Sequence, residues 1–263
     1  MKYAFANMFL DEKDLLSQQT FSTDKLLLEN NDSQIKTINE FYKDEAKAIL
    51  FVNGFMGSGK VEVVKYSTSF LNGDVITLKY NCFNSTILDD ILLEFFKEFR
   101  KLASNGIIEL PKIKTDNFAE RINTYFSHID KPFLIILDSF EEVLDKNRQE
   151  ILDFLFHIMS LEKTKIILIG RSYDAKLFEG HDVARVTTKA LERKIFDKLL
   201  QREKIKAGAS IVDEFYQHTR GYYFYTILAI KIIQARKSDL SSFMERLKKM
   251  LLPFSVFLEK ELL

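Results

Sequence analysis

A glycine-rich segment that ends in a lysine is the part of the sequence best suited to bind an anion. It follows the apolar run 48–52 and precedes a predicted helix at 61–70. Glycines permit a tight turn in which successive N–H groups point at one anion, and a helix start adds free N–H groups and a positive dipole end. Lys60 would place its ammonium on the outer phosphates of a nucleotide. The predicted phosphate-binding loop consists of Gly54, Phe55, Met56, Gly57, Ser58, Gly59, Lys60 and Val61.

The last position of this loop departs from the usual pattern. A serine or threonine normally follows the lysine, and its hydroxyl binds Mg²⁺ beside the phosphates. Val61 stands there instead. Nucleotide binding is therefore better supported than metal-assisted hydrolysis.

A second candidate lies where the apolar run 133–137 ends in Asp138. A carboxylate at the carboxyl end of a buried parallel strand opens into the crevice where α/β proteins bind ligands. Asp138 would hold Mg²⁺, directly or through water, and Glu141 or Glu142 would orient the attacking water. The alternative is that Asp138 only caps a helix.

A third candidate follows the apolar run 166–169, which ends in Gly170-Arg171. An arginine at this strand end would reach the terminal phosphate with a fork of donors. The alternative is a surface salt bridge. Both alternatives stay open at the level of sequence.

Composition limits the other classes of function. The chain has 263 residues, with 38 Lys and Arg against 38 Asp and Glu, so no net charge favours nucleic acid or an anionic membrane. One cysteine, Cys82, excludes an internal disulfide, and 4 histidines without metal-binding spacing disfavour a zinc or iron site. The apolar N-terminus is short, and no run approaches the ~18 residues that span a bilayer. We expect a cytoplasmic protein.

The elements that must position these residues alternate along the first part of the chain. Apolar runs at 48–52, 74–80, 133–137, 166–169 and 184–186 predict five strands, and helical periodicity separates them at 61–70, 87–102, 117–129 and 148–160. Alternating strands and helices indicate a parallel sheet with helices on both faces. Asp32 or Ser33 is predicted to cap a helix that runs to Tyr42.

From about residue 188 the pattern is helical only. The predicted helices are 190–206, 210–219, 222–236, 239–251 and 254–263. We therefore divide the chain into an N-terminal helical segment at 1–45, an α/β core at 46–188 and a helical lid at 189–263.

These motifs, in this order, resemble the STAND class of P-loop NTPases, the AAA+-related signalling ATPases that include NACHT and NB-ARC. The likeness rests on the glycine loop, the Asp138-Ser139-Phe140-Glu141-Glu142 box, Gly170-Arg171, and the lid turn Thr219-Arg220-Gly221-Tyr222-Tyr223. It covers about residues 34–236. Val61 and Tyr222-Tyr223 depart from the family pattern, so the chain is identified as a divergent member.

The resemblance implies a five-stranded sheet of order 5-1-4-3-2, ATP or ADP held between core and lid, and Mg²⁺ as a cofactor that Val61 disfavours. It also implies a switch between nucleotide-dependent forms, with a protein partner or self-association as its output. The first hypothesis is thus an ATP-dependent switch with slow hydrolysis, in which Lys60 binds phosphate, Asp138 binds Mg²⁺, Glu141 orients water and Arg171 contacts the γ-phosphate.

Two further hypotheses stay open. Val61 motivates a nucleotide-binding module without hydrolysis. Basic residues of the lid motivate a DNA-associated AAA+ ATPase of the origin-recognition type, which the neutral net charge disfavours. These basic residues are Lys194, Lys198, Arg202, Lys204, Lys206, Arg246, Lys248 and Lys249.

Overall fold

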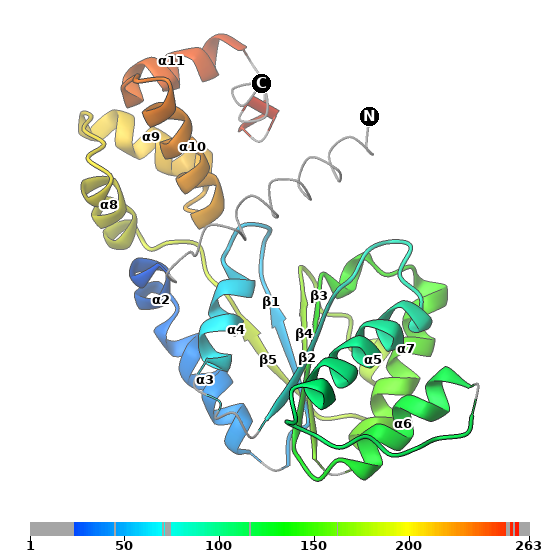
Figure 1. Cartoon of the computed structure of the whole chain (residues 1–263). Helices are drawn as coiled ribbons and strands as arrows, with labels where there is room; N and C mark the ends of the chain where they lie inside the picture. Colours follow the sequence, from blue (N-terminus) through cyan, green and yellow to red (C-terminus); the bar gives the residue numbers. More distant parts are fainter. Residues whose placement is uncertain are drawn as a thin grey trace.

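A computed structural model describes residues 24–44, 46–69, 71, 75–115, 117–161, 163–250, 253, 254, 256 and 257. The predictions for residues 1–23 and for most of the helix expected at 254–263 lie outside this part of the chain. Figure 1 shows an α/β core and, beyond it, a group of helices, α8 to α11 (within residues 193–250), which we call the lid.

The core contains a parallel sheet whose strand order is β2-β3-β4-β1-β5. Every pairing in this sheet is parallel. Read from the other edge, this is the predicted order 5-1-4-3-2, which is thereby confirmed. The strands are β1 (Ile49–Asn53), β2 (Ile76–Asn81), β3 (Phe133–Asp138), β4 (Thr164–Gly170) and β5 (Val183–Thr187).

The three central strands are buried on both faces, because helices cover the sheet on each side. Alternate residues of β3 therefore join different cores: Ile135 and Leu137 pack in one, Leu134 and Ile136 in the other. Strands β2 and β5 at the edges keep exposed positions. This explains why the central strands are continuous apolar runs in the sequence.

Two layers of helices enclose the sheet (Figure 1). One face is covered by α3 (Asp32–Lys43) and α4 (Lys60–Thr68), whose apolar residues share a core with β1, β3 and β4. The opposite face is covered by α5 (Leu88–Ser104), α6 (Phe118–His128) and α7 (Asp145–Met159). The carboxyl ends of the strands, where the candidate residues lie, stay outside these layers.

The lid has its own apolar core, built by residues such as Phe196, Phe215 and Phe243. Its helices are α8 (Arg193–Arg202), α9 (Ala209–Thr219), α10 (Tyr223–Ala235) and α11 (Leu240–Met250). A short helix, α2 (Lys25–Asn30), precedes α3 and packs against α8. Within the described ranges, no helix has the length and apolar character needed to cross a membrane.

Some predicted boundaries are wrong by a few residues. Helix α7 begins at Asp145, before the predicted 148, because the polar residues of its first turn carry no apolar signal. Helix α8 covers only part of the predicted range 190–206, since Lys204 adopts a left-handed conformation after its last turn. Asn31, rather than Asp32 or Ser33, precedes α3, and its side chain makes no capping bond.

Candidate functional site

The glycine-rich segment forms a loop between the end of β1 and the start of α4. Gly57 and Gly59 have φ angles of 81° and 85°, in the left-handed region that glycine adopts without strain. The side chain of Lys60 folds back over the loop, and its Nζ donates to the carbonyl oxygens of Gly54 at 2.8 Å and Phe55 at 3.1 Å. A flexible cation thus lies over a glycine turn at a helix start, an arrangement that suits phosphate.

Residues of α10, of α2 and of the segment between core and lid contact this loop. The backbone N–H of Phe224, in the first turn of α10, donates to the carbonyl of Gly57 at 3.0 Å. The hydroxyls of Ser58 and Thr188 lie 2.7 Å apart. A Cβ added to Gly59 would lie 2.7 Å from Cδ1 of Leu27 in α2. The lid, the segment that leads to it and the N-terminal helix therefore all touch the phosphate loop.

Asp138 ends β3, at the same edge of the sheet as the phosphate loop. The residue after it, Ser139, has a left-handed φ of 57° and donates its N–H to Oδ1 of Asp138 at 2.8 Å. Ser139, and not Asp138, is the residue that precedes the short 3₁₀ helix Phe140–Glu142. The alternative role of Asp138 as a helix cap is therefore not observed.

Glu141 and Arg171 meet across the ends of β3 and β4. Arg171 Nε donates to Glu141 Oε1 at 2.8 Å, and its guanidinium also forms an ion pair with Glu142. The other oxygen of Glu141, Oε2, is buried and accepts no hydrogen bond from the described residues. A Cβ on Gly170 would lie 2.9 Å from this oxygen, so a larger residue there would displace the Glu141 carboxylate. The salt bridge considered for Arg171 thus joins two candidate residues.

Cys82 lies beneath the acidic residues, just beyond β2. Its backbone N–H donates to the carbonyl of Asp138 at 2.8 Å, and its side chain is buried. Burial, together with the negative charges of Asp138 and Glu141, raises the pKa of the Cys82 thiol to about 12. Burial thus favours the neutral thiol, which is a poor nucleophile.

The residues fit Mg²⁺ only as an ion held largely by phosphate oxygens and water. Among the described residues, no group of three or more His, Cys, Asp or Glu side chains is placed to hold a metal. Mg²⁺ commonly binds through one or two carboxylates together with nucleotide phosphates. Asp138 supplies one carboxylate at the carboxyl end of β3, the end of the sheet where the phosphate loop lies. Val61, in the first turn of α4, packs its side chain against the apolar core and offers no oxygen.

A cavity of about 560 Å³ opens between the phosphate loop, Arg171 and the lid. Such a volume is in the range that small-molecule ligands fill. Its wall includes Phe55, which is 67% exposed and whose ring centroid lies 5.3 Å from that of Tyr222. Arg220 and Arg171, whose guanidinium is paired with Glu141 and Glu142, also line the cavity. The cavity is therefore open beside the residues predicted to bind phosphate.

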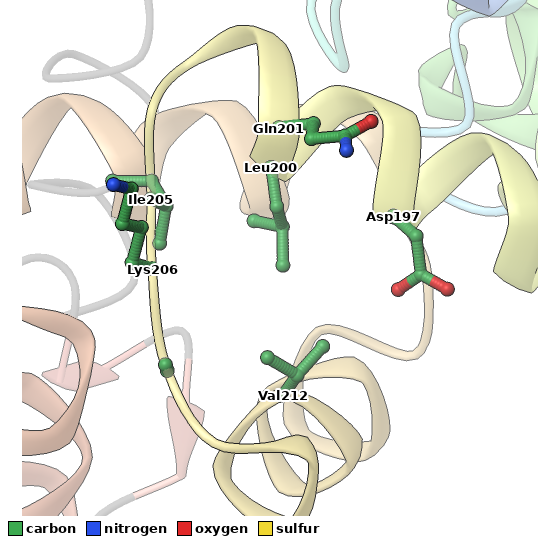
Figure 2. A pocket seen from close by; sticks show the side chains of 7 residues that line it. Asp197, Leu200, Gln201, Ile205, Lys206 and Val212 are labelled. Carbon is green, nitrogen blue, oxygen red and sulfur yellow. The ribbon is translucent and has the colours of Figure 1, made fainter.

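A second cavity, of about 360 Å³, lies within the lid between α8 and α9 (Figure 2). Leu200 and Val212 face each other across it, and Asp197 lies at one side. Arg193 already holds the Asp197 carboxylate, with Nε 2.9 Å from Oδ1. This cavity contains none of the candidate phosphate-binding residues, so it is not part of the candidate site.

Several basic residues that motivated the DNA hypothesis are paired with acids. Lys198 Nζ lies 2.5 Å from Glu29 Oε1, and Lys248 Nζ lies 2.8 Å from Glu214 Oε2. Arg202 is held by Asp24. Local pairing lowers the positive potential that nucleic acid would meet.

Sequence reasoning missed three kinds of residue at the site. Asn81, at the end of β2, pairs in register with Asp138, and its position at a strand end is the signal that would have found it. Thr188 and Phe224 touch the loop from far along the chain, and no local pattern indicates such contacts. Asp24, just before α2, binds Arg202 of the lid, and no local pattern in the sequence marks this contact either.

Comparison with known proteins gives one family match. The model of a family described as "AAA domain" matches residues 43–178, which is more than half of the chain. A comparison with curated proteins finds no match. The matched region contains the phosphate loop, Asp138, Glu141 and Arg171.

Solved structures share the fold at low sequence identity. A Walker-type ATPase of Pyrococcus abyssi superposes over 82% of this chain with a TM-score of 0.61 and 13% identity. Cdc6p from Pyrobaculum aerophilum covers 84% with a TM-score of 0.58 and 13% identity. A STAND protein with a tetratricopeptide repeat sensor from Pyrococcus horikoshii covers 84% with a TM-score of 0.51 and 18% identity. The chain spans 70%, 66% and 32% of these three chains, respectively.

Proposed function

Because the chain belongs to the AAA domain family and has a P-loop NTPase fold, we propose that it is an ATP-binding molecular switch of the STAND or a close AAA+ type. The loop from Gly54 to Val61 binds the phosphates, and Lys60 neutralises the β and γ groups. Asp138 would hold Mg²⁺, which would supply charge neutralisation during phosphoryl transfer. Glu141 orients water and Arg171 contacts the γ-phosphate.

The observation that carries this proposal is the hydrogen bond from Phe224 N–H to the Gly57 carbonyl, at 3.0 Å. It joins the first turn of α10 to the middle of the phosphate loop. When the Gly57 carbonyl points toward the lid, the loop can direct its own N–H groups to the other side, toward phosphate. A change in the loop on nucleotide binding would thus act directly on the lid. Lid position would then be read by a protein partner or by a second copy.

The switch can be tested by measuring the distance between lid and core. Spin labels at Lys97→Cys in α5 and Lys194→Cys in α8 occupy exposed positions, and the buried Cys82 does not need to be removed. We expect different interlabel distances with saturating ATP and saturating ADP, and no response to either nucleotide when Lys60→Ala is added. Identical distances in a protein that binds both nucleotides would exclude the switch.

Hydrolysis is proposed as slow and Mg²⁺-dependent. Val61 removes one metal-positioning hydroxyl, so a module that binds nucleotide without hydrolysis is the alternative. ATP turnover by the parent protein well above that of Lys60→Ala would support hydrolysis and exclude the module that only binds nucleotide.

A further inference from the structure

Helix α2 is joined to the lid through the residue that precedes it, Asp24. The Asp24 carboxylate caps the helix by accepting the Leu26 N–H at 2.9 Å. The same carboxylate binds the guanidinium of Arg202, at the end of α8, with Nη1–Oδ1 and Nη2–Oδ2 distances of 2.6 and 2.8 Å. The hydroxyl of Tyr223, at the start of α10, donates to Oδ2 at 2.6 Å. One carboxylate thus ties two lid helices to α2.

The electrostatics of this cluster favour the ionised carboxylate. The Asp24 side chain is only 9% exposed. Burial alone would raise the pKa of Asp24, but hydrogen bonds from Arg202, Tyr223 and the Leu26 N–H outweigh it and lower the pKa. Two-pronged arginine–carboxylate pairs are among the stronger hydrogen-bonded contacts in proteins. Removing Arg202 would leave the Asp24 carboxylate poorly compensated, whereas Arg202 keeps an ion pair with Glu203, at 2.9 Å, when Asp24 loses its charge.

The body of α2 contacts the phosphate loop and the segment between core and lid. The side chain of Leu27 packs against Gly59. The Asn30 side chain accepts the Glu192 N–H at 2.8 Å and donates to the Ala190 carbonyl at 3.1 Å. Since α2 touches the loop, the connecting segment and the lid, a lid that moves away from the core must either carry α2 with it or release Asp24.

We propose that Asp24, Arg202 and Tyr223 form a latch that holds the lid against the phosphate loop and sets the rate of nucleotide release. The part concerning nucleotide release rests on the proposed function. The latch itself is a property of the folded chain and can be tested without nucleotide. Release of Asp24 leaves Glu29–Lys198 as an ion pair between α2 and α8, but removes the tie to α10, whose Phe224 N–H binds Gly57.

Asp24→Asn is the sharpest test of the latch. Asparagine is as good a helix cap as aspartate, so α2 keeps its cap while the charge toward Arg202 is lost. The matched control is Asp32→Asn, which removes an equally charged residue of the same region, whose ion pair among the described residues is with exposed Lys36. Hydrogen exchange of the full chain without nucleotide would be followed at 219–226, 188–192 and, as an internal reference, 133–138.

We expect Asp24→Asn to speed exchange at 219–226 and 188–192 by roughly tenfold, the loss expected for a charged hydrogen bond, and to leave 133–138 unchanged. Asp32→Asn should behave like the parent. Parent-like exchange in Asp24→Asn would overturn the latch. If Asp24→Asn also speeds exchange at 133–138, Tyr223→Phe decides, because it removes only one hydroxyl: faster exchange confined to the lid supports the latch, and no change overturns it.

Release of fluorescent ADP then tests the link to the site. We expect ADP to leave Asp24→Asn roughly tenfold faster than it leaves Asp32→Asn. Equal rates of ADP release would overturn the proposal that the latch sets the rate of nucleotide release. If the parent protein does not bind the nucleotide, both the proposed function and the effect of the latch on nucleotide release are contradicted. Hydrogen exchange would still decide whether the latch exists.

Discussion

Arg171 donates from Nε to Oε1 of Glu141 at 2.8 Å, so the residue proposed to contact the γ-phosphate is bound to the residue proposed to orient water. Glu142 forms a second ion pair with the same guanidinium. The Glu141 side chain is 18% exposed, and its second oxygen accepts no hydrogen bond from the described residues. A phosphate would therefore compete with two carboxylates for the Arg171 guanidinium, whose Nε and Nη2 they already engage.

This pair predicts an effect on the choice between ATP and ADP. Glu141→Gln removes the ion pair between residue 141 and Arg171 and so makes the guanidinium more available to the γ-phosphate. We expect the affinity for ATP relative to ADP to rise about threefold, the size of effect that a partly exposed ion pair contributes. Arg171→Gln should abolish the preference for ATP. Calorimetric titration with both nucleotides measures the two ratios. An unchanged ratio in Arg171→Gln would show that this side chain does not reach the γ-phosphate.

Restoring the missing hydroxyl should restore metal chemistry. Val61→Thr places a hydroxyl at the position that binds Mg²⁺ in related loops, and we expect Mg²⁺-dependent ATP turnover to rise at least severalfold. The cost to folding should be about 1 kcal/mol, since Val61 is only partly buried. Steady-state phosphate release measures the gain. The double variant Lys60→Ala/Val61→Thr is the control, and turnover that persists in it would mean that the activity comes from elsewhere.

Alanine substitutions at Gly59 and Gly106 distinguish the cost of a strained backbone from the cost of a steric clash. Both have positive φ, 85° and 69°, so alanine should cost about 1 kcal/mol at either site for the left-handed backbone. At Gly106 an added Cβ meets nothing within 4 Å, whereas at Gly59 it meets the methyl groups of Leu27. We expect Gly59→Ala to lose about 1–3 kcal/mol more than Gly106→Ala. Urea unfolding compares the two, and equal losses would contradict the contact with Leu27.

The buried thiol gives a pH-dependent prediction. Because the pKa of Cys82 is raised to about 12, iodoacetamide at pH 8.5 should label the folded chain very slowly and the urea-unfolded chain rapidly. The stability linked to the neutral thiol is complete below the unfolded pKa of about 8.5 and falls as pH rises toward the folded value. Cys82→Ala should remove that decline between pH 8.5 and 10. Rapid labelling of the native protein would show that the thiol is not buried beneath Asp138.

Much of the core could be predicted from the sequence because its signals are local. The apolar runs at 48–52 and 133–137 match β1 and β3 to within one residue, since strands buried on both faces must be continuously apolar. Strand β4 begins earlier than predicted, at Thr164, because Thr164 and Lys165 join the sheet by pairing with β3 despite their polarity.

The contacts around the phosphate loop could not be predicted, because they join residues far apart in the chain. The contacts of Phe224 with Gly57 and of Asp24 with Arg202 depend on how the lid packs against α2 and the phosphate loop. Neither pair has a spacing or composition that marks it in the sequence. The roles proposed for Lys60, Asp138, Glu141 and Arg171, and the division of the chain near residue 188, stay predictions.

The measurement that tests the central claim most directly is a calorimetric titration of the full chain with ATP and with ADP, each in Mg²⁺ and in EDTA. Lys60→Ala is the test variant and Lys65→Ala, an exposed lysine in the next turn of α4, is its control. We expect the parent and Lys65→Ala to bind both nucleotides and Lys60→Ala to bind neither. Binding by Lys60→Ala that equals the parent's, or no binding by the nucleotide-free parent, would contradict a nucleotide site at this loop.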